Sequence, residues 1–311
     1  MSRHRSQILS ERELIREIRV KAGVRSRAMR VGIGDDCAVL RVRSGQDTLV
    51  TTDLSIEGVH FRRDWQSAES IGHRCLVRGL SDIAAMGGTP VAAFLSLSCP
   101  QGTDRKWLDG FFEGLLRLAR RCDVTLAGGD TAVSPASIFA DIVVVGSVAT
   151  GAAALRSGAQ PGDLVYTTGA LGGAARDLRI LMSGTGKLGR DSVFLWPEPQ
   201  IRVGRKLRDI ASAMIDTSDG LSVDLAHICE ESAVTAILDP ARIPIAPGAS
   251  LEDALHGGED YQLLFTAPVG ARIPKSMHRI GEIVRKKRYG VYLERDGKLT
   301  HLPQHGWEHQ L

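Results

Sequence analysis

The residues in this sequence that could do chemistry are aspartates that stand in or beside short segments of glycine, serine or threonine. Glycine allows a tight backbone path, so a short carboxylate there can point into a cleft. We expect these aspartates at strand ends, where open α/β sheets bind ligands. A single aspartate in this setting is more often a turn or helix cap. Several that converge would repel one another and raise each other's pKa unless cations lay between them. The set comprises Asp35, Asp36, Asp53, Asp82, Asp130, Asp216 and Asp219.

The chemistry that suits this set is binding of a polyphosphate through Mg²⁺. Magnesium takes oxygen ligands, typically one or two carboxylates together with substrate phosphates. The hydroxyls of Thr51, Thr52 and Ser218 stand beside the aspartates and are compatible oxygens. The usual phosphate-binding loop, Gly-x-x-x-x-Gly-Lys-Ser/Thr, does not occur in the sequence. The residues therefore indicate a site with several Mg²⁺ ions, provided that the fold brings the carboxylates together.

Composition further restricts the class of protein that this chain can be. The chain has 311 residues, 43% hydrophobic and 24% charged, which is typical of a globular protein of about two domains. A net charge of +3 gives no sign of nucleic-acid or membrane binding. The five cysteines are scattered and include no Cys-x-x-Cys pair, which suits a reducing compartment. Because Met1 to Arg19 carries charges throughout and has no apolar core, we expect a cytoplasmic protein.

Other patterns are weaker. Residues 184–189 match Gly-x-Gly-x-x-Gly but follow a helix pattern, so a flexible turn is preferred to a dinucleotide site. Histidines recur every four residues at 301, 305 and 309, but Pro303 and Gly306 interrupt any helix, which favours a solvated tail over a metal site. No Gly-x-Ser-x-Gly motif is present, so acyl transfer has no support.

The elements that must position the aspartates alternate between strand and helix, which predicts an α/β (α+β) fold. A glycine-rich stretch at 150–162 divides the pattern into an N-terminal domain, 1–149, and a C-terminal domain, 150–311. Ser10 and Glu13 form a capping-box pattern for the first helix, and Thr103 is the expected N-cap of the third. Helices are expected at 11–21, 67–86, 103–122, 170–183, 200–209 and 221–231, and strands at 37–42, 48–54, 91–98, 124–127, 138–148, 164–168, 213–215, 235–238, 261–266 and 290–294.

An ordered set of short motifs containing these aspartates resembles the thiamine-monophosphate kinase family, in the superfamily of aminoimidazole ribonucleotide synthetase. Each motif is weak alone, but their order along nearly the whole chain is specific. Gln262 stands where the family often has Glu. The motifs are Gly32-Ile33-Gly34-Asp35-Asp36-Cys37-Ala38, Thr51-Thr52-Asp53, Glu57-Gly58-Val59-His60-Phe61, Leu80-Ser81-Asp82-Ile83-Ala84-Ala85-Met86-Gly87, Gly128-Gly129-Asp130-Thr131, Arg156-Ser157-Gly158-Ala159, Asp216-Thr217-Ser218-Asp219-Gly220-Leu221 and Gly257-Gly258-Glu259-Asp260-Tyr261.

The resemblance implies transfer of the γ-phosphate of ATP to thiamine monophosphate, giving thiamine diphosphate. It also implies a homodimer in which the N-terminal domains share a β-barrel and each C-terminal domain completes a site. By position it assigns Mg²⁺ to Asp36, Thr51, Thr52, Asp53, Asp82, Asp130, Asp216 and Asp219, ATP to Gly129, Asp130, Arg156 and Ser218, and thiamine monophosphate to His60, Glu259 and Trp307.

This chemistry asks for no general base, because the attacking phosphate monoester is largely dianionic near neutral pH. Arg156 can bind phosphate oxygens in a bidentate manner, and Trp307 can stack on the cationic thiazolium. Both His60 and Trp307 could instead be packed core side chains. Two other functions stay open: an ATP-dependent synthetase that activates an amide or carbonyl oxygen, and a nucleotide-sensing module without catalysis.

Overall fold

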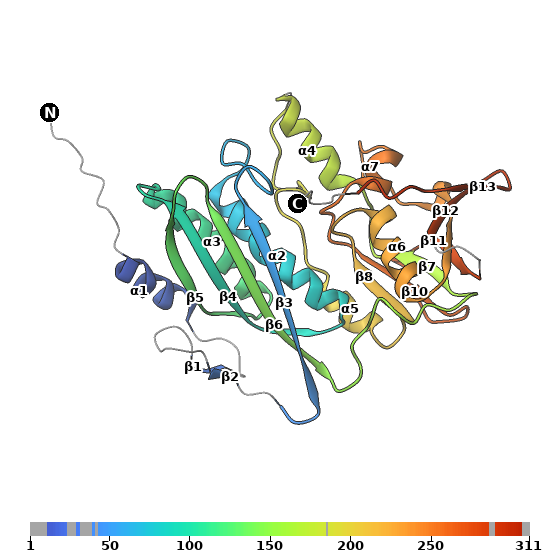
Figure 1. The fold of residues 1–311 in the computed structure, drawn as a ribbon, viewed down its shortest axis with the longest axis horizontal. Helices are drawn as coiled ribbons and strands as arrows, with labels where there is room; N and C mark the ends of the chain where they lie inside the picture. Colours follow the sequence, from blue (N-terminus) through green and yellow to red (C-terminus); the bar gives the residue numbers. More distant parts are fainter. Residues whose placement is uncertain are drawn as a thin grey trace. The chain divides into compact units, whose positions relative to one another are not determined.

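The computed structural model describes residues 11–23, 29–31, 39–40, 43–184, 186–285 and 290–306 (Figure 1). These residues divide into two compact units, each with its own sheet. Unit 1 consists of the described residues within Met1–Ser44, Val50–Gly79 and Pro90–Gly146. Unit 2 consists of those within Gly45–Leu49, Leu80–Thr89 and Ser147–Leu311.

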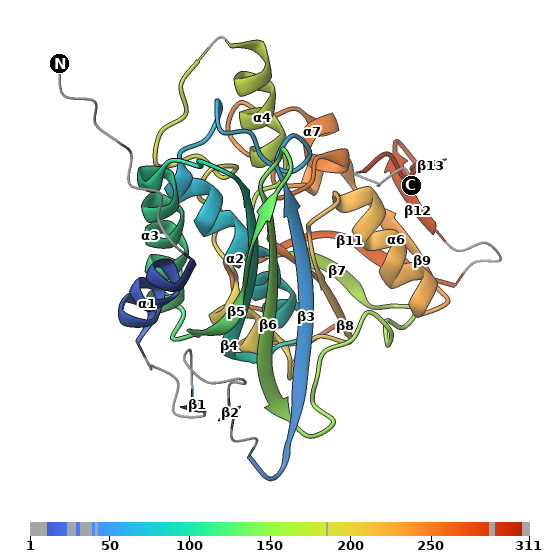
Figure 2. The same cartoon turned by 60° about the vertical axis from the view of Figure 1, so that its left-hand side comes forward.

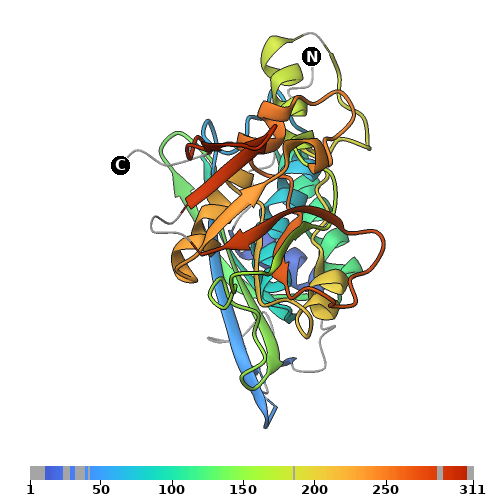
Figure 3. The same ribbon diagram turned by 90° about the vertical axis from the view of Figure 1, so that its right-hand side faces the viewer.

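The main sheet of unit 1 has four strands in the order β3-β6-β4-β5, so β3 and β5 are its edges (Figure 2). Helices α2 and α3 cover one face of it (Figures 1 and 3). Strands β4 and β5 are parallel. The elements are β3 (Gln46–Ile56), α2 (Ala68–Ala85), β4 (Thr89–Pro100), α3 (Arg105–Arg121), β5 (Thr125–Ser134) and β6 (Phe139–Ala149).

The burial of every second side chain along β6 explains why helices pack against one face of this sheet. In β6 every second residue is buried, including Ala140, Ile142 and Val144, as expected for a strand with helices on one side. Two glycines allow α2 and α3 to approach closely. A Cβ on Gly72 would lie 1.9 Å from the carbonyl oxygen of Phe111, and a Cβ on Gly114 would lie 1.8 Å from that of Glu69.

The N-terminal part of unit 1 contributes helix α1 (Glu11–Ala22) and a two-stranded sheet of β1 (Met29–Val31) and β2 (Val39–Leu40). Helix α1 forms where the sequence predicts it, but its expected cap, Ser10, lies outside the described residues. Asp35 and Asp36 also lie outside them.

Unit 2 has a seven-stranded sheet in the order β13-β12-β9-β11-β7-β10-β8, seen in green, orange and red in Figure 3. Its neighbours are antiparallel except for β9 and β12. Helix α6 packs against the sheet and buries Leu225 and Ile228 in the core of this unit. The strands are β7 (Leu164–Thr167), β8 (Ala213–Asp216), β9 (Thr235–Leu238), β10 (Leu263–Ala267), β11 (His278–Val284), β12 (Gly290–Arg295) and β13 (Lys298–His301), and the helices are α4 (Gly173–Ser183), α5 (Ile201–Leu207), α6 (Leu221–Glu231), the 3₁₀ helix η1 (Pro240–Arg242) and α7 (Leu251–His256).

The mixed α/β class with two sheets agrees with the sequence prediction, and several details differ. The cap of α3 is Asp104, which accepts from the Lys106 amide, whereas Thr103 donates to the carbonyl of Pro100. Helix α7 and strands β11 and β13 were not predicted. Both main sheets are open among the described strands. None of the helices in the described ranges combines the length and apolar composition needed to cross a membrane.

Candidate active site

An acidic group in unit 2 forms around the end of β8. Asp216, the last residue of this strand, is buried, and its Oδ2 accepts a 2.6 Å hydrogen bond from the Ser81 hydroxyl. Burial is the main cause that raises the pKa of Asp216 to about 7, and the neighbouring Asp82 carboxylate raises it further. The Ser81 hydrogen bond and the positive charge of Arg156 act in the opposite direction. The structure thus brings Asp82, Arg156 and Asp216 within electrostatic reach of one another.

The turn after β8 holds the next carboxylate. Asp219 precedes Gly220, whose φ of 117° favours glycine. Asp224, in the first turn of α6, accepts from the amides of Asp219 at 3.3 Å and Gly220 at 3.0 Å. Burial chiefly, then the charges of Asp216 and Asp219, raise the pKa of Asp224 well above its ordinary value. Asp219 therefore belongs to the same acidic group.

A strained loop lies against this turn. Glu259 has φ 66° and Tyr261 has φ 50°, both in the left-handed region that non-glycine residues rarely adopt. The amide of Glu259 donates to the carbonyl of Ser218 at 2.9 Å, and the amide of Tyr261 donates to that of Thr217 at 3.0 Å. Strain that the surroundings maintain is a feature of binding sites, which supports a functional role for this loop.

Between these two residues, Asp260 is buried and accepts from the backbone amides of Gly172 and Ala174 at the start of α4. Burial raises the pKa of Asp260 to about 6, against the effect of these hydrogen bonds.

The segment that leads to Trp307 also reaches the acidic turn. A Cβ on Gly306 would lie 2.3 Å from the carbonyl oxygen of Asp219, so the chain passes very close there. The rings of His305 and His256 are 5.4 Å apart between centroids. Trp307 itself lies outside the described residues, so its assigned contact with thiamine monophosphate stays a prediction.

In unit 1, the predicted ligands on β3 divide between the two faces of the strand. A Cβ on Gly79 of α2 would lie 3.4 Å from the Thr51 methyl group, so Thr51 faces the helices. Asp53 has the same orientation by the alternation of the strand, in which Thr51, Asp53 and Ser55 are less exposed than their neighbours. Burial chiefly raises the pKa of the Cys75 thiol in α2, and the charges of Asp53 and Asp141 raise it further, against the charge of Arg78. Thr52 faces the other side, where its hydroxyl donates to Asp141 Oδ1 at 2.8 Å. Adjacent residues of a strand point to opposite faces of the sheet, so Thr51 and Thr52 cannot face the same side.

Gly129 and Asp130 lie on β5, at the opposite edge of the sheet from β3. The pairing with β4 shifts by one residue just before Gly128, which indicates a bulge. Gly129 has φ 147°, and a Cβ there would lie 1.8 Å from the carbonyl oxygen of Leu95, so only glycine fits. Asp130 is exposed, and its Oδ1 accepts from the Thr131 amide at 2.8 Å. With two strands between them, β3 and β5 are roughly 14 Å apart, from a strand spacing of about 4.8 Å.

His60 is half-buried and follows β3 in a tight turn. Its Nδ1 accepts from the Ile56 amide at 3.0 Å. The neutral ring therefore carries its proton on Nε2, which makes that atom a hydrogen-bond donor. This orientation is compatible with a phosphate oxygen as a partner.

The positions of three carboxylates correct the expectation that all lie at strand ends. Asp53 and Asp130 lie inside longer strands, and Asp82 lies in the last turns of α2. Of the predicted aspartates that the structure describes, only Asp216 ends a strand. The sequence prediction ended these strands at residues 54 and 127. In the structure β3 continues to Ile56 and β5 continues to Ser134, so Asp53 and Asp130 lie inside them.

The described residues also indicate which side chains could bind a metal ion. In the described part of the chain, no three His, Cys, Asp or Glu side chains gather closely enough to hold an ion by themselves. Asp82 and Asp216 nevertheless present hard oxygen donors whose mutual repulsion a cation would relieve. Such a pair fits Mg²⁺ that completes its coordination with water and phosphate oxygens.

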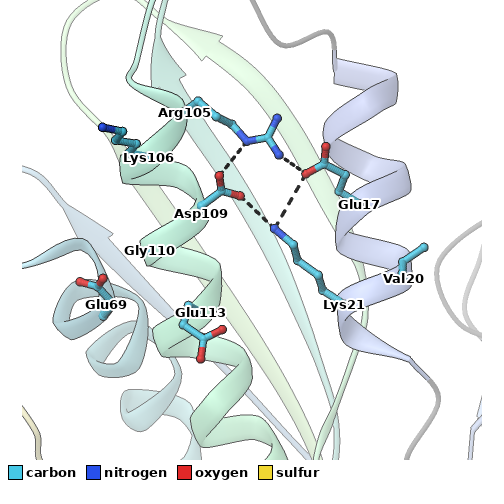
Figure 4. Close-up of a pocket in the computed structure, with 9 residues that line it drawn as sticks. All are labelled: Glu17, Val20, Lys21, Glu69, Arg105, Lys106, Asp109, Gly110 and Glu113. Carbon is cyan, nitrogen blue, oxygen red and sulfur yellow. Dashed lines mark hydrogen bonds and ion pairs between the residues drawn. The ribbon is translucent and has the colours of Figure 1, made fainter.

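The pocket in Figure 4 is separate from these residues. It has a volume of about 810 Å³ and lies between α1, α2 and α3 of unit 1. Its charged side chains pair with one another: Asp109 accepts from Lys21 and from Arg105, each at 2.9 Å. None of the predicted site residues lines it, so we assign no substrate to it.

Comparison with known proteins places these features in a family. Residues 34–148 match the family model for AIR synthase related protein, N-terminal domain. The hydrogenase maturation protein HypE of Escherichia coli, 18% identical, has a TM-score of 0.76 over 94% of this chain and 98% of its own, which shows the fold alone.

Closer relatives share both sequence and structure. A crystal structure of thiamine-monophosphate kinase from Stenotrophomonas maltophilia is 34% identical, with a TM-score of 0.82 over 94% of this chain and 98% of its own. A structure of AaThiL complexed with AMPPCP and TMP is 30% identical, with a TM-score of 0.78 over 86% of this chain and 89% of its own. The thiamine-monophosphate kinase of Escherichia coli K12 is 40% identical over 76% of each chain, and that of Bacillus subtilis is 32% identical over 90% of this chain and 93% of its own. The chain therefore belongs to the thiamine-monophosphate kinase family.

Proposed function

We propose that the protein transfers the γ-phosphate of ATP directly to thiamine monophosphate, giving thiamine diphosphate and ADP. The observation that carries the proposal is the acidic group of Asp82, Asp216 and Asp219 beside Arg156, in a chain that is 40% identical to a thiamine-monophosphate kinase. A related structure holds both AMPPCP, an analogue of ATP, and TMP.

The chemistry needs positioning more than proton transfer. A phosphate oxygen of thiamine monophosphate attacks the γ-phosphorus, and the bond from this phosphorus to the β,γ-bridging oxygen breaks as ADP leaves. The attacking group is largely dianionic at neutral pH, since its second pKa is about 6, so no general base is required. The difficulty is the approach of two polyanions, which orientation and charge neutralisation overcome.

Protein groups have distinct parts in this proposal. Arg156 forks onto phosphate oxygens of ATP, with Gly129, Asp130 and Ser218 as further contacts. His60 donates from Nε2 to the phosphate of thiamine monophosphate, and Glu259 complements the thiamine charge. Trp307 stacks on the thiazolium ring.

Magnesium would be held by the residues that the resemblance assigns to it, Asp36, Thr51, Thr52, Asp53, Asp82, Asp130, Asp216 and Asp219. Bound Mg²⁺ would neutralise charge on the phosphate oxygens during transfer. The Thr52 hydroxyl donates its proton to Asp141, which leaves the lone pairs of its oxygen as candidate donors to a cation.

We also propose that residues 1–149 dimerise through a barrel shared by two copies, and that residues 150–311 complete each site. The open sheet of unit 1 has the two edges that such closure needs, and both edges carry predicted ligands, Asp53 and Asp130. Size-exclusion chromatography with light scattering should give about 67 kDa, twice the chain mass of 33.5 kDa. Full activity of a monomer would exclude the shared barrel.

The test of the function is direct. The protein is mixed with ATP, Mg²⁺ and thiamine monophosphate, and thiamine diphosphate is followed by chromatography. Product that requires both substrates and disappears with EDTA supports the proposal. ADP without thiamine diphosphate, or ADP that appears only with an aminoimidazole precursor, would show a different enzyme of the superfamily.

The role of Trp307 has its own measurement. Trp307→Ala should raise the KM for thiamine monophosphate and leave the KM for ATP unchanged, because only the thiazolium is a stacking partner. Equal increases in both constants would contradict stacking.

A further inference from the structure

We propose that Asp260 is a positioning residue that fixes the backbone of Glu259 by tying the loop 257–262 to the first turn of α4. The inference rests on the proposed function, in which Glu259 contacts thiamine monophosphate. It is carried by hydrogen bonds, backbone conformation and close packing within unit 2.

The first observation is a clamp made by both carboxylate oxygens of Asp260. Oδ2 accepts from the amide of Gly172, and Oδ1 accepts from the amide of Ala174 at 2.9 Å. Gly172 is the N-cap of α4 and has no side chain with which to cap it. Asp260 supplies the missing acceptors from a distant loop, and its exposed fraction is only 2%.

The second observation is the strain on either side of the clamp. Glu259 and Tyr261 both have left-handed φ angles, and each costs free energy that neighbouring contacts must offset. Their amides bond to the carbonyls of Ser218 and Thr217. The loop is thus held to the β8 turn on both sides of Asp260 and to α4 through Asp260 itself. Without the clamp, the strained conformation of Glu259 loses one of its three anchors.

The third observation is that the neighbouring glycines leave no room for adjustment. A Cβ on Gly172 would lie 2.7 Å from the backbone nitrogen of Ala254, and a Cβ on Gly258 would lie 2.3 Å from the carbonyl oxygen of Ser218. The start of α4 is therefore packed against the backbone of α7, and the loop is packed against the backbone of the β8 turn. A shift at Asp260 is passed on to Glu259 and to the turn that carries Ser218.

The chain offers a matched control in Asp163, which is also buried in unit 2 and accepts from the Gln160 amide at 2.9 Å and from the Ser212 hydroxyl. Strand register places it at the other end of the sheet. Asp163 precedes Leu164, which pairs with Ala267 at the far end of β10, whereas Glu259 precedes the start of β10. Loss of this carboxylate should cost stability without moving Glu259.

The experiment compares Asp260→Asn and Asp163→Asn in the full chain. Asn keeps the volume but has one acceptor oxygen, so one amide at the start of α4 loses its partner. Asp260→Asn should raise the KM for thiamine monophosphate roughly tenfold and change the KM for ATP by less than about twofold. Asp163→Asn should leave both constants within about twofold of the wild type. Amide hydrogen exchange should accelerate at 170–176 and 257–262 only in Asp260→Asn.

Three outcomes would overturn the inference: a KM for thiamine monophosphate that matches the Asp163→Asn value, equal rises in both KM values, or unchanged exchange at 257–262. If Asp260→Asn does not fold, Asp260→Glu and Asp163→Glu are compared by the same readouts. If the wild type makes no thiamine diphosphate, the proposed function fails, and the exchange rates alone still decide whether Asp260 holds Glu259.

Discussion

Asp216→Asn should make the metal-free protein more stable at alkaline pH while it abolishes transfer. The wild-type carboxyl has its pKa raised from 3.8 to about 7, chiefly by burial and then by Asp82. Between pH 4 and 7 the folded state keeps a proton that the unfolded chain has released. The free energy of unfolding therefore falls as pH rises through this window, and the penalty is complete above pH 7.

The size of the effect follows from the shift. Moving a pKa from 3.8 to about 7 corresponds to a penalty on the order of 4 kcal/mol, shared with the neighbouring Asp82. At roughly 2 °C per kcal/mol for a chain of this size, the melting temperature should fall by several degrees between pH 5 and 8. Asn cannot ionise and still offers an oxygen to the Ser81 hydroxyl, so the variant should decline less steeply than the wild type. The decline that remains comes from Asp224 and Asp260, whose pKa values are also raised by burial.

The assay is thermal unfolding in EDTA at pH 5, 6, 7 and 8, with thiamine diphosphate formation measured separately in Mg²⁺. The control is Asp209→Asn. The Arg208 hydrogen bond keeps the pKa of Asp209 below its ordinary value, so this group stays charged across the range and its loss should not alter the slope. If Asp216→Asn declines with pH as steeply as the wild type, the electrostatic account of the acidic group is wrong. Adding Mg²⁺ at pH 8 should stabilise the wild type more than the variant.

Three other predictions test the sheet of unit 1 and its N-terminal helix. Asp53→Asn and Asp130→Asn should each lower kcat/KM about a hundredfold or more with little change in melting temperature, and near-normal turnover in either would refute the multi-metal site. Gly129→Ala should cost at least about 2 kcal/mol in urea unfolding, because its Cβ would meet the Leu95 carbonyl, whereas Gly102→Ala, with φ 81° and open space, should cost about 1 kcal/mol. Arg105→Ala should speed hydrogen exchange in α1 more than Lys106→Ala does, because Arg105 bonds to Glu17 of α1 and to Asp109. These exposed pairs are worth about 0.2–1 kcal/mol each, and equal exchange in both variants would show that the Arg105 pairs do not help to hold the helix.

Helices and strands with a strong hydrophobic periodicity were predictable from the sequence. Those that form because of their contacts with other parts of the fold were not. Helix α2 and strand β6 form within a residue or two of their predicted bounds, because one face of each is apolar at the right period. Strand β11 carries His278, Arg279 and Glu282 on its more exposed positions, and it is a strand only because β7 and β9 pair with both of its edges. Helix α7 has six residues, too few for a periodic signal, although its capping box of Ser250 and Asp253 was readable.

The candidate site divides in the same way. Motifs identified Asp82, Asp216 and Arg156, and the structure brings these three within electrostatic reach of one another. Thr51 and Thr52 both lie in the predicted strand 48–54, so the alternation of their side chains was predictable, but the sequence could not show which face the helices cover. Asp260 was inside a motif but had no assigned role, since its partners, Gly172 and Ala174, are almost ninety residues away in the chain.

The sequence contains 22 aspartates and 14 glutamates. The structure gives two physical reasons for this excess of aspartate. One is capping: Asp104 and Asp239 are N-cap residues, where short side chains are preferred, and Asp253 accepts from the Ser250 amide in a capping box. The other is the acidic group around the end of β8, where burial and then neighbouring carboxylates raise the pKa values of Asp216 and Asp224. Asp224 and Asp260 join the two, because each is a buried carboxylate that accepts backbone amides beside a predicted ligand. In this fold the capping chemistry of aspartate therefore also holds the site in place.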